Sequence, residues 1–473
     1  MLYLSYVSCH GKERDMSANS YGLNIIIVGA GKVGETLTSQ LIKEKHDITV
    51  IDQNAEAINR ITGMYDVMGV IGNGASYSVQ MEAGVENTDL LIAVTDSDEL
   101  NLLTCTVAKQ VAGCAAIARV RTPDYNSEAD YLRDKLGLAM IINPELEAAR
   151  EASRILYLPT ALEVGSFAHG QAEIIKFKVP EKSTLDGISL IELSKMIKNR
   201  INVCVVERKD EIIIPDGRFV INSGDVLSFV CQHKRVRAFL DEIGIKTRQV
   251  KNTMIIGGGK AGFYLAKFLI SMGISVKIIE RDRSRCEELA ELLPKAIIIN
   301  GDGTNEELLR EEGIETVQSF VPLTGIDEVN VILTLFAKRV SEAKVITKIS
   351  HMGFSGVLDS LDLGSVIYPM FITSEAIIAY VRAKNNTQGT NIDTLYHMYD
   401  HRVEAIEFSV EKSSKVTGTM LKDLSLKDNL IVSFINRNGK ILLPGGLDRI
   451  EVGDTVMIVT THEGLSEIDD ILA

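Results

Sequence analysis

Three glycines and an acidic residue near the start of the chain have the spacing of a phosphate-binding loop. Gly29, Gly31 and Gly34 directly follow the apolar run 24–28, and Asp52 ends a second apolar run. The first glycine permits a tight turn, the second lets the backbone approach a pyrophosphate, and the third lets a helix pack on its strand. Free N–H groups at the helix start can hold the anion. Asp52 is placed to accept hydrogen bonds from ribose hydroxyls and would repel a 2′-phosphate, which favours NAD over NADP.

The same pattern occurs a second time in the chain. Residues 252–262 (NTMIIGGGKAG) match residues 24–34 (NIIIVGAGKVG) at an offset of 228, and Glu280 matches Asp52 at the same offset. The run TDSDELN at 95–101 also recurs, as TGIDEVN, at an offset of 229. One offset maintained along the chain indicates a duplication. Gly257, Gly259, Gly262 and Glu280 are therefore the candidate site residues of the second copy.

The elements around these loops predict the fold class. From residue 24 to about 142, six short apolar runs alternate with helical patterns, which predicts a doubly wound parallel sheet with a ligand crevice at the C-terminal ends of its strands. A helical stretch and then four short strands follow in each copy. We therefore expect an α/β protein in which two Rossmann domains alternate with two small α+β domains. The predicted bounds are 1–21 for a disordered extension, 22–145 and 250–370 for the Rossmann domains, and 146–245 and 371–473 for a linker helix with its α+β domain.

Composition excludes several classes of function. The net charge is -14 and the pI is near 5.2, so the chain repels nucleic acid and anionic lipid. Its apolar runs are far shorter than the roughly 20 residues that cross a bilayer. The six cysteines lack CxxC spacing, which argues against zinc and a disulfide framework and favours buried thiols. Residues 1–21 lack the apolar core of a secretory signal, and Met16 is an alternative start.

With these motifs in hand, the chain from about residue 22 resembles the TrkA family of potassium-uptake regulatory proteins. That family has two KTN (RCK-N) domains alternating with two RCK-C domains. The resemblance implies a cytoplasmic protein, peripheral on the inner face of the membrane, that binds NAD(H) and ATP or ADP. It also implies a TrkH-type potassium-translocating partner in the membrane and a homo-oligomer, for which we expect a tetramer.

The resemblance also assigns nucleotide contacts, motif by motif. In the first copy these are Gly29, Ala30, Gly31, Lys32, Val33, Gly34, Asp52, Asn73, Gly74, Thr95, Asp96 and Arg119. In the second copy they are Gly257, Gly259, Lys260, Ala261, Gly262, Glu280, Asp302 and Gly303. Lys348 takes the position of Arg119, and Gly325 with Ile326 replaces Asp96 with Ser97, so the ligand and occupancy of the second site stay open.

Two other functions share the glycine fingerprint. An NAD-dependent oxidoreductase would need a substrate domain with a proton-transfer group, but the α+β halves resemble each other and carry no convergent set of His, Lys and carboxylate. A stand-alone redox or nucleotide sensor that binds DNA would need a basic helix-turn-helix segment, which the sequence lacks. We therefore expect neither catalytic nor metal-ligating residues.

Overall fold

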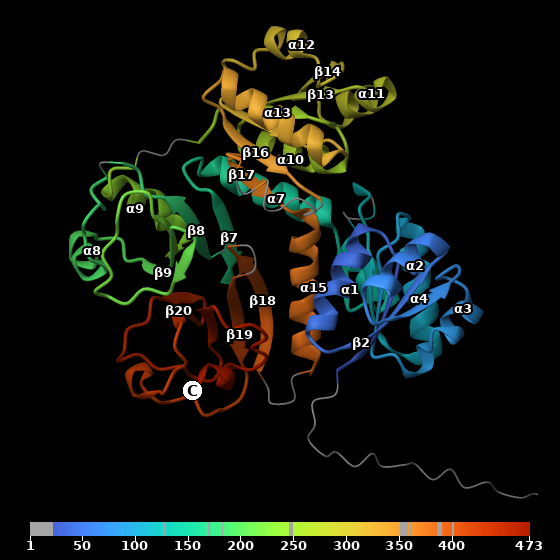
Figure 1. Cartoon of the computed structure of the whole chain (residues 1–473), viewed down its shortest axis with the longest axis horizontal. Coiled ribbons are helices and arrows are strands. Elements are labelled where there is room, and N and C mark those ends of the chain that lie inside the picture. Colours follow the sequence, from blue (N-terminus) through green and yellow to red (C-terminus); the bar gives the residue numbers. More distant parts are fainter. Residues whose placement is uncertain are drawn as a thin grey trace, which may run out of the picture.

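The computed structural model describes residues 22–473 except for 124, 126–127, 169–170, 182, 246–248, 351–357, 359–360, 386–389 and 400–401. The predicted extension over 1–21 lies outside the described residues. The described chain forms two parallel and two antiparallel sheets, which alternate along the sequence (Figure 1). This confirms the predicted fold class. Among the described residues, no helix has the length and hydropathy needed to cross a membrane.

The first parallel sheet has the strand order β3-β2-β1-β4-β5-β6. Its strands are β1 (Asn24–Val28), β2 (Asp47–Asp52), β3 (Met68–Ile71), β4 (Leu90–Ala93), β5 (Ala115–Arg119) and β6 (Met140–Ile142). Its helices are α1 (Lys32–Lys43), α2 (Ala55–Met64), α3 (Tyr77–Glu82), α4 (Asp98–Ala112) and α6 (Ala129–Leu136). The central strands β1 and β4 are apolar apart from Asn24, because helices cover both faces of the sheet. The order reverses between β1 and β4, where such sheets open a crevice.

The second parallel sheet repeats this order as β14-β13-β12-β15-β16-β17. Its strands are β12 (Asn252–Ile256), β13 (Ser275–Glu280), β14 (Ile297–Asn300), β15 (Ser319–Pro322), β16 (Lys344–Lys348) and β17 (Ser365–Ile367). Its helices are α10 (Lys260–Ser271), α11 (Arg283–Leu292), α12 (Glu306–Glu311) and α13 (Asp327–Val340). Helices α2 and α11 also begin alike, since Asn54 and Asp282 each accept a backbone N–H bond at the N-cap.

The two antiparallel sheets share one topology, β10-β9-β11-β8-β7 and β18-β19-β22-β20-β21. The first comprises β7 (Glu163–Phe167), β8 (Ala172–Lys178), β9 (Asn202–Arg208), β10 (Glu211–Ile213) and β11 (Val226–Gln232), with α8 (Leu190–Met196) and α9 (Val236–Glu242). The second comprises β18 (Thr390–Met398), β19 (Val403–Val410), β20 (Leu430–Arg437), β21 (Lys440–Leu442) and β22 (Thr455–Thr460). Strands β7 and β18 were not among the predicted strands, because EVGSF and TNIDTLYHM lack a clear apolar alternation.

The linker helices exchange partners between the two copies. Helix α7 (Pro144–Tyr157) follows the first Rossmann domain but packs on α10 of the second, and α15 (Pro369–Asn385) follows the second but packs on α1 of the first (Figure 1). One apolar core accordingly joins the first α+β domain to the second Rossmann domain, and another joins the first Rossmann domain to the second α+β domain. The predicted limits at 145/146 and 370/371 fall inside these helices.

The two α+β domains pack against each other through a third apolar core, which contains Phe167 and Phe434. At its centre, Cys204 Sγ on β9 lies 3.1 Å from Ser433 Oγ on β20. These two residues occupy equivalent positions of the duplication, so a local two-fold axis passes between them. The arrangement is that of a homodimer whose two subunits have become one chain.

Candidate functional site

A cavity of about 620 Å³ lies over the C-terminal ends of β1, β2 and β4. This volume is in the range of small-molecule sites, and the position is the crevice that the strand order predicts. Its described lining residues are Val28, Gly29, Ala30, Gly31, Lys32, Val33, Ile51, Asp52, Gln53, Asn54, Ala57, Arg60, Gly72, Gly74, Val94, Thr95, Asp96, Leu100, Arg119 and Met370.

The glycine loop has the geometry that an anion requires. Gly29 has a φ of +114°, which favours glycine, and a Cβ on Gly34 would lie 1.8 Å from the oxygen of Gly29. A Cβ on Gly31 would meet no atom within 4 Å, so the space above the start of α1 is open. The N–H groups at the start of α1 can therefore reach a phosphate, and the residues present fit a dinucleotide.

Asp52 holds the loop in this shape. Its Oδ2 accepts a hydrogen bond from the backbone N–H of Ala30 at 2.6 Å, and its Oδ1 accepts one from Asn54 at 2.8 Å. Glu280 does the same for Gly258 and Asp282 in the second copy, at 2.7 and 2.9 Å. The predicted contact of Asp52 with a ribose stays a prediction, but the carboxylate lines the cavity.

The TDSDELN segment ties two strand ends together at the crevice. Asn101 Oδ1 accepts hydrogen bonds from the Thr95 backbone and hydroxyl at 2.8 and 2.7 Å, and its Nδ2 donates to the oxygen of Arg119 at 2.9 Å. Thr324, Asn330 and Lys348 repeat these bonds in the second copy. This recurring network explains why both copies keep the threonine and asparagine at this spacing.

Arg119 stands between the first cavity and the linker helix α7. Its guanidinium lies 3.5 Å from Glu145 Oε1, and Arg121 approaches the same oxygen at 3.8 Å. Burial lowers the pKa of Arg119, and Glu145 opposes that shift. Arg119 Nε and Glu145 Oε2 are both buried without a hydrogen-bond partner. The Arg119–Glu145 pair therefore leaves hydrogen-bonding atoms unused, so Arg119 can form a hydrogen bond to a ligand oxygen.

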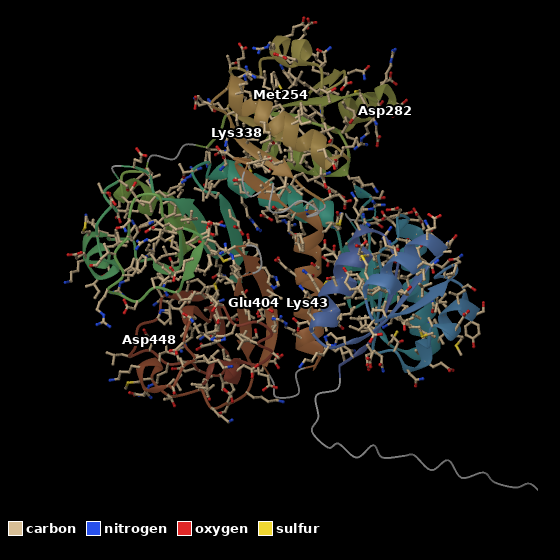
Figure 2. All side chains as sticks on the ribbon, in the orientation of Figure 1. Lys43, Met254, Asp282, Lys338, Glu404 and Asp448 are labelled. Carbon is tan, nitrogen blue, oxygen red and sulfur yellow. The ribbon has the colours of Figure 1, made fainter. Side chains whose placement is uncertain are left out.

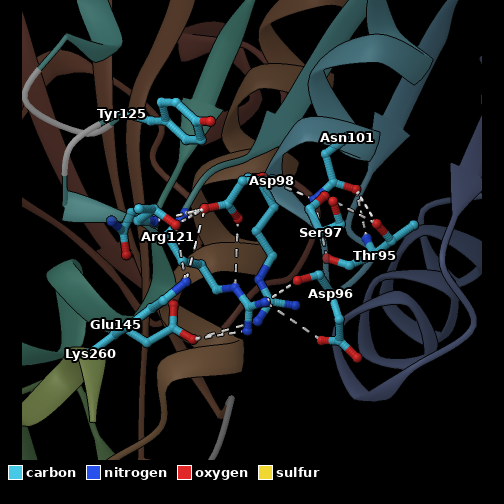
Figure 3. Close-up of polar contacts among 12 residues, drawn as sticks. Thr95, Asp96, Ser97, Asp98, Asn101, Arg121, Tyr125, Glu145 and Lys260 are labelled. Atoms are coloured by element: carbon cyan, nitrogen blue, oxygen red, sulfur yellow. Dashed lines mark hydrogen bonds and ion pairs between the residues drawn. The ribbon is translucent and has the colours of Figure 1, made fainter. Parts of the chain in front are cut away.

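A lysine from the second Rossmann domain reaches the same end of the first sheet (Figure 3). Lys260, the first residue of α10, donates to Thr122 Oγ1 at 3.2 Å and lies 3.9 Å from Asp98 Oδ2. Burial alone would raise the pKa of Asp98, but its bonds from Thr122 and Arg121 lower it. The ammonium of Lys260 thus faces the first copy, whereas its motif position predicted a phosphate of the second site.

The remaining predicted residues divide between cavity and scaffold. Gly34 and Asn73 do not line the first cavity: Gly34 packs against Gly29, and Asn73 Oδ1 accepts from Ala75 N at 3.0 Å. Arg60 and Met370 do line it and were missed. Met370 belongs to α15, more than 300 residues away in sequence, so no local signal could have found it.

The second cavity is smaller, about 390 Å³. Its described lining is Ile256, Gly257, Gly259, Ile279, Glu280, Arg281, Asp302, Gly303, Thr304, Leu323, Thr324, Gly325, Ile326 and Val329. Among the predicted residues, Lys260, Ala261 and Gly262 are outside this lining. Gly259 has open space like Gly31, since a Cβ there meets no atom within 4 Å.

Two Rossmann crevices, each followed by an α+β domain, define a tandem nucleotide-binding protein. The TrkA-N domain model matches residues 25–144 and 253–369, and the TrkA-C domain model matches 174–244 and 405–473. The chain therefore belongs to the TrkA family, and the family prediction is confirmed.

Relatives and solved structures agree with this assignment. The Trk system potassium uptake protein TrkA of Haemophilus influenzae is 30% identical over 454 residues, covering 95% of this chain and 98% of that protein. TrkA of Vibrio alginolyticus is 31% identical over 452 residues, covering 94% and 98%. The structure titled GsuK channel bound to NAD aligns with a TM-score of 0.62 at 18% identity, covering 95% of this chain and 78% of that one. The GsuK RCK domain aligns with a TM-score of 0.63 at 18% identity, covering 97% and 96%. At this identity the two structures support the fold.

Proposed function

We propose that this chain is a nucleotide-binding regulatory subunit of a Trk-type potassium uptake system, without enzymatic activity of its own. The observation that carries the proposal is the first cavity. There an open glycine loop, the start of α1 and the cations Lys32 and Arg119 border one space. Such a site can hold a phosphorylated ligand, and its described lining contains no histidine, cysteine or serine to act on that ligand as a general base or nucleophile.

The ligands are NAD(H) and ATP or ADP. All of them share an adenosine diphosphate, which suits the loop and Asp52 at the end of β2. Two likenesses support the choice: one neighbouring GsuK structure is titled as bound to NAD, and another, with a TM-score of 0.50, as bound to ADP. Beyond the shared part, ATP presents anionic oxygens where NADH presents a nicotinamide ribose. Lys32 and Arg119 are placed to distinguish them.

Arg119 connects the first cavity to the linker helix α7. It contacts Glu145 in the first turn of α7, and α7 packs on the second Rossmann domain. A phosphate that competes for Arg119 would weaken that contact, whereas a ligand that leaves Arg119 alone would keep it. A ligand shifts a conformational equilibrium only by its differential affinity for the two states, and the Arg119–Glu145 pair supplies such a difference.

The partner is a TrkH-type potassium-translocating protein, on which the chain sits at the cytoplasmic face of the membrane as a homotetramer. The names of the relatives and the acidic charge, which disfavours direct lipid binding, support this placement. Light scattering at micromolar concentration tests the tetramer. A mass near the 51.9 kDa of one chain would contradict it.

Reconstituted potassium flux tests the regulatory role. Vesicles containing the partner and the chain should respond differently to saturating ATP, ADP and NADH, and Arg119→Ala should reduce the difference. Asp52→Ala should weaken NADH binding by about 1–3 kcal/mol in calorimetry through lost charge-assisted hydrogen bonds. Identical flux with all three nucleotides would make the chain a passive tether and end the proposal.

A further inference from the structure

The two cavities differ in the charges that face them. Besides its two acids, Asp52 and Asp96, the first cavity is lined by the cations Lys32, Arg60 and Arg119. The second cavity is lined by the acids Glu280 and Asp302, and Arg281 is its one cation among the described residues. The first cavity therefore has a surplus of positive charge and the second a surplus of negative charge.

The first two of these cations have different counterparts in the second copy. The equivalent of Lys32 is Lys260, whose ammonium is held by Thr122 of the first copy. The equivalent of Arg60 is Glu288, but its partner Arg285 donates from Nε to the loop oxygen of Gly258 at 2.8 Å, as Arg60 donates to the matching oxygen of the first copy at 3.3 Å. The second glycine loop therefore lacks the lysine and keeps an arginine that is paired with a carboxylate.

The equivalent of the third cation, Arg119, also lies outside the second cavity. The equivalent of Arg119 is Lys348, which does not line the second cavity. Burial lowers its pKa, the carboxylates of Asp327 and Glu145 oppose that shift, and Lys32 adds to it. Lys348 therefore belongs to the contact between the Rossmann domains and not to the second cavity.

The second cavity keeps the features that hold a single phosphate. Gly259 leaves open space at the start of α10, a helix of 12 residues. The walls beyond the loop are apolar, with Leu323, Ile326 and Val329, and the volume of about 390 Å³ is well below that of the first cavity. Among the described residues, additional phosphates would thus meet Arg281 of the lining and Arg285, which is paired with Glu288.

We propose that the second cavity binds a nucleoside or nucleoside monophosphate and excludes a nucleoside triphosphate. This rests on the proposed function, in which both cavities are nucleotide sites. The ligand class follows from charge, since the carboxylates of the cavity repel each added anionic oxygen and the equivalents of Lys32 and Arg119 lie outside its described lining. One chain would then bind two different nucleotide species, one in each cavity.

Matched variants isolate each cavity in the full-length protein. Gly31→Asp and Gly259→Asp place a carboxylate in open space at backbone φ values of -76° and -63°, which any residue adopts. Thermal unfolding should therefore stay unchanged. Calorimetry of Gly31→Asp should give one AMP per chain with ATP binding at least tenfold more weakly than AMP. Gly259→Asp should bind ATP at the first cavity.

A charge reversal sharpens the test. In the Gly31→Asp background, Glu288→Arg replaces the carboxylate that pairs with Arg285 by a second cation beside the glycine loop, so ATP should bind at least threefold more tightly while AMP changes little. Equal affinity of Gly31→Asp for AMP and ATP would overturn the inference. So would loss of all binding in Gly31→Asp while Gly259→Asp still binds ATP, which leaves the proposed function standing. If neither variant nor the unmodified protein bound any nucleotide, the proposed function itself would fail.

Discussion

Each linker helix meets the α+β domain that follows it at a contact that we call a joint. The two joints share one backbone arrangement but differ in their polar side chains. In the second joint, His397 pairs in register with Glu404 and its ring contacts Glu404 and Glu375 at 3.4 and 3.3 Å. In the first joint, Ser166 takes the histidine's position opposite Glu173. Counted from Pro144 and Pro369, which begin the two linker helices, Arg150 takes the position of Glu375 and Glu151 is the next residue. The second joint therefore has a histidine between its carboxylates, whereas in the first joint the cation whose charge acts on Glu151 and Glu173 is Arg154 of the linker helix.

The second joint extends into a buried ion network. Arg382 of α15 donates to Glu404 at 3.0 and 3.1 Å and to Glu44 at the end of α1 at 3.1 Å. The side chains of Arg382 and Glu404 are each 3% exposed. Figure 2 labels Glu404 and Lys43, the neighbour of Glu44, close to α15. The network thus connects the second α+β domain to the first Rossmann domain through α15.

The first joint is neutralised by protonation instead. Glu151 borders a cavity of about 350 Å³ together with Glu163 and Glu375. Burial, followed by the charges of Glu163 and Glu375, raises the pKa of Glu151 to about 8. A duplicated joint can thus stabilise buried carboxylates either with paired cations or with a proton, and stabilisation by a proton depends on pH.

The largest effect should come from removing the central arginine of the network. Arg382→Leu leaves Glu44 and Glu404 without this partner in the interior, so we expect a loss of about 3–5 kcal/mol in the free energy of unfolding, measured by denaturant titration. Arg218→Leu is the control, because its pair with Asp216 is exposed and should cost less than about 0.5 kcal/mol. A loss below 1 kcal/mol for Arg382→Leu would remove the network from the account of stability.

The next effect is a loss of stability at alkaline pH. Glu375 and Glu404 raise the pKa of His397 to about 9 from 6.5 against the effect of burial, and Glu151 is raised to about 8 from 4.5. Both groups hold a proton more tightly when folded, so their contributions are full only below these ordinary values and are lost as the pH passes about 8 and 9. Unfolding measured from pH 7 to pH 9.5 should lose roughly 1–3 kcal/mol.

Two variants separate the contributions of the two joints to this pH dependence. Glu151→Gln should flatten the part of the curve near pH 8, and His397→Gln should remove the part near pH 9. Each change should also shift the other's part slightly, since Glu375 acts on both Glu151 and His397. A curve that keeps its shape in both variants would place the titration elsewhere.

The smallest effect is expected for an arginine–aspartate pair that both α+β domains contain. The loss of unfolding free energy should be equal in the two domains, and the difference between the copies would then be confined to the joints. Arg208 binds Asp225 through two hydrogen bonds of 2.8 and 2.7 Å, and Arg437 binds Asp454 through two of 2.8 Å. Arg208→Ala and Arg437→Ala each leave a buried carboxylate partly unsatisfied, so each should cost about 1–2 kcal/mol. Differential scanning calorimetry should place the two variants within a few tenths of a kcal/mol of each other. A clear inequality would extend the asymmetry beyond the joints.

The sequence by itself determined the elements that depend on local order. The repeat, the parallel sheets and the glycine loops follow from spacing over a few residues, because a strand, a tight turn and a helix start are set by neighbours in the chain. The loop prediction also named Lys32 and Asp52, which both line the first cavity.

Only the tertiary structure decided where the two copies meet. The exchange of α7 and α15, the edge strands β7 and β18, and the contact of Lys260 with Thr122 join segments that are far apart in sequence. Lys32 and Lys260 share one motif position, yet only Lys32 lines the cavity of its own copy, because the ammonium of Lys260 is held by Thr122 of the other copy. No local pattern encodes that difference, since burial and charge at an interface are set by residues hundreds of positions away.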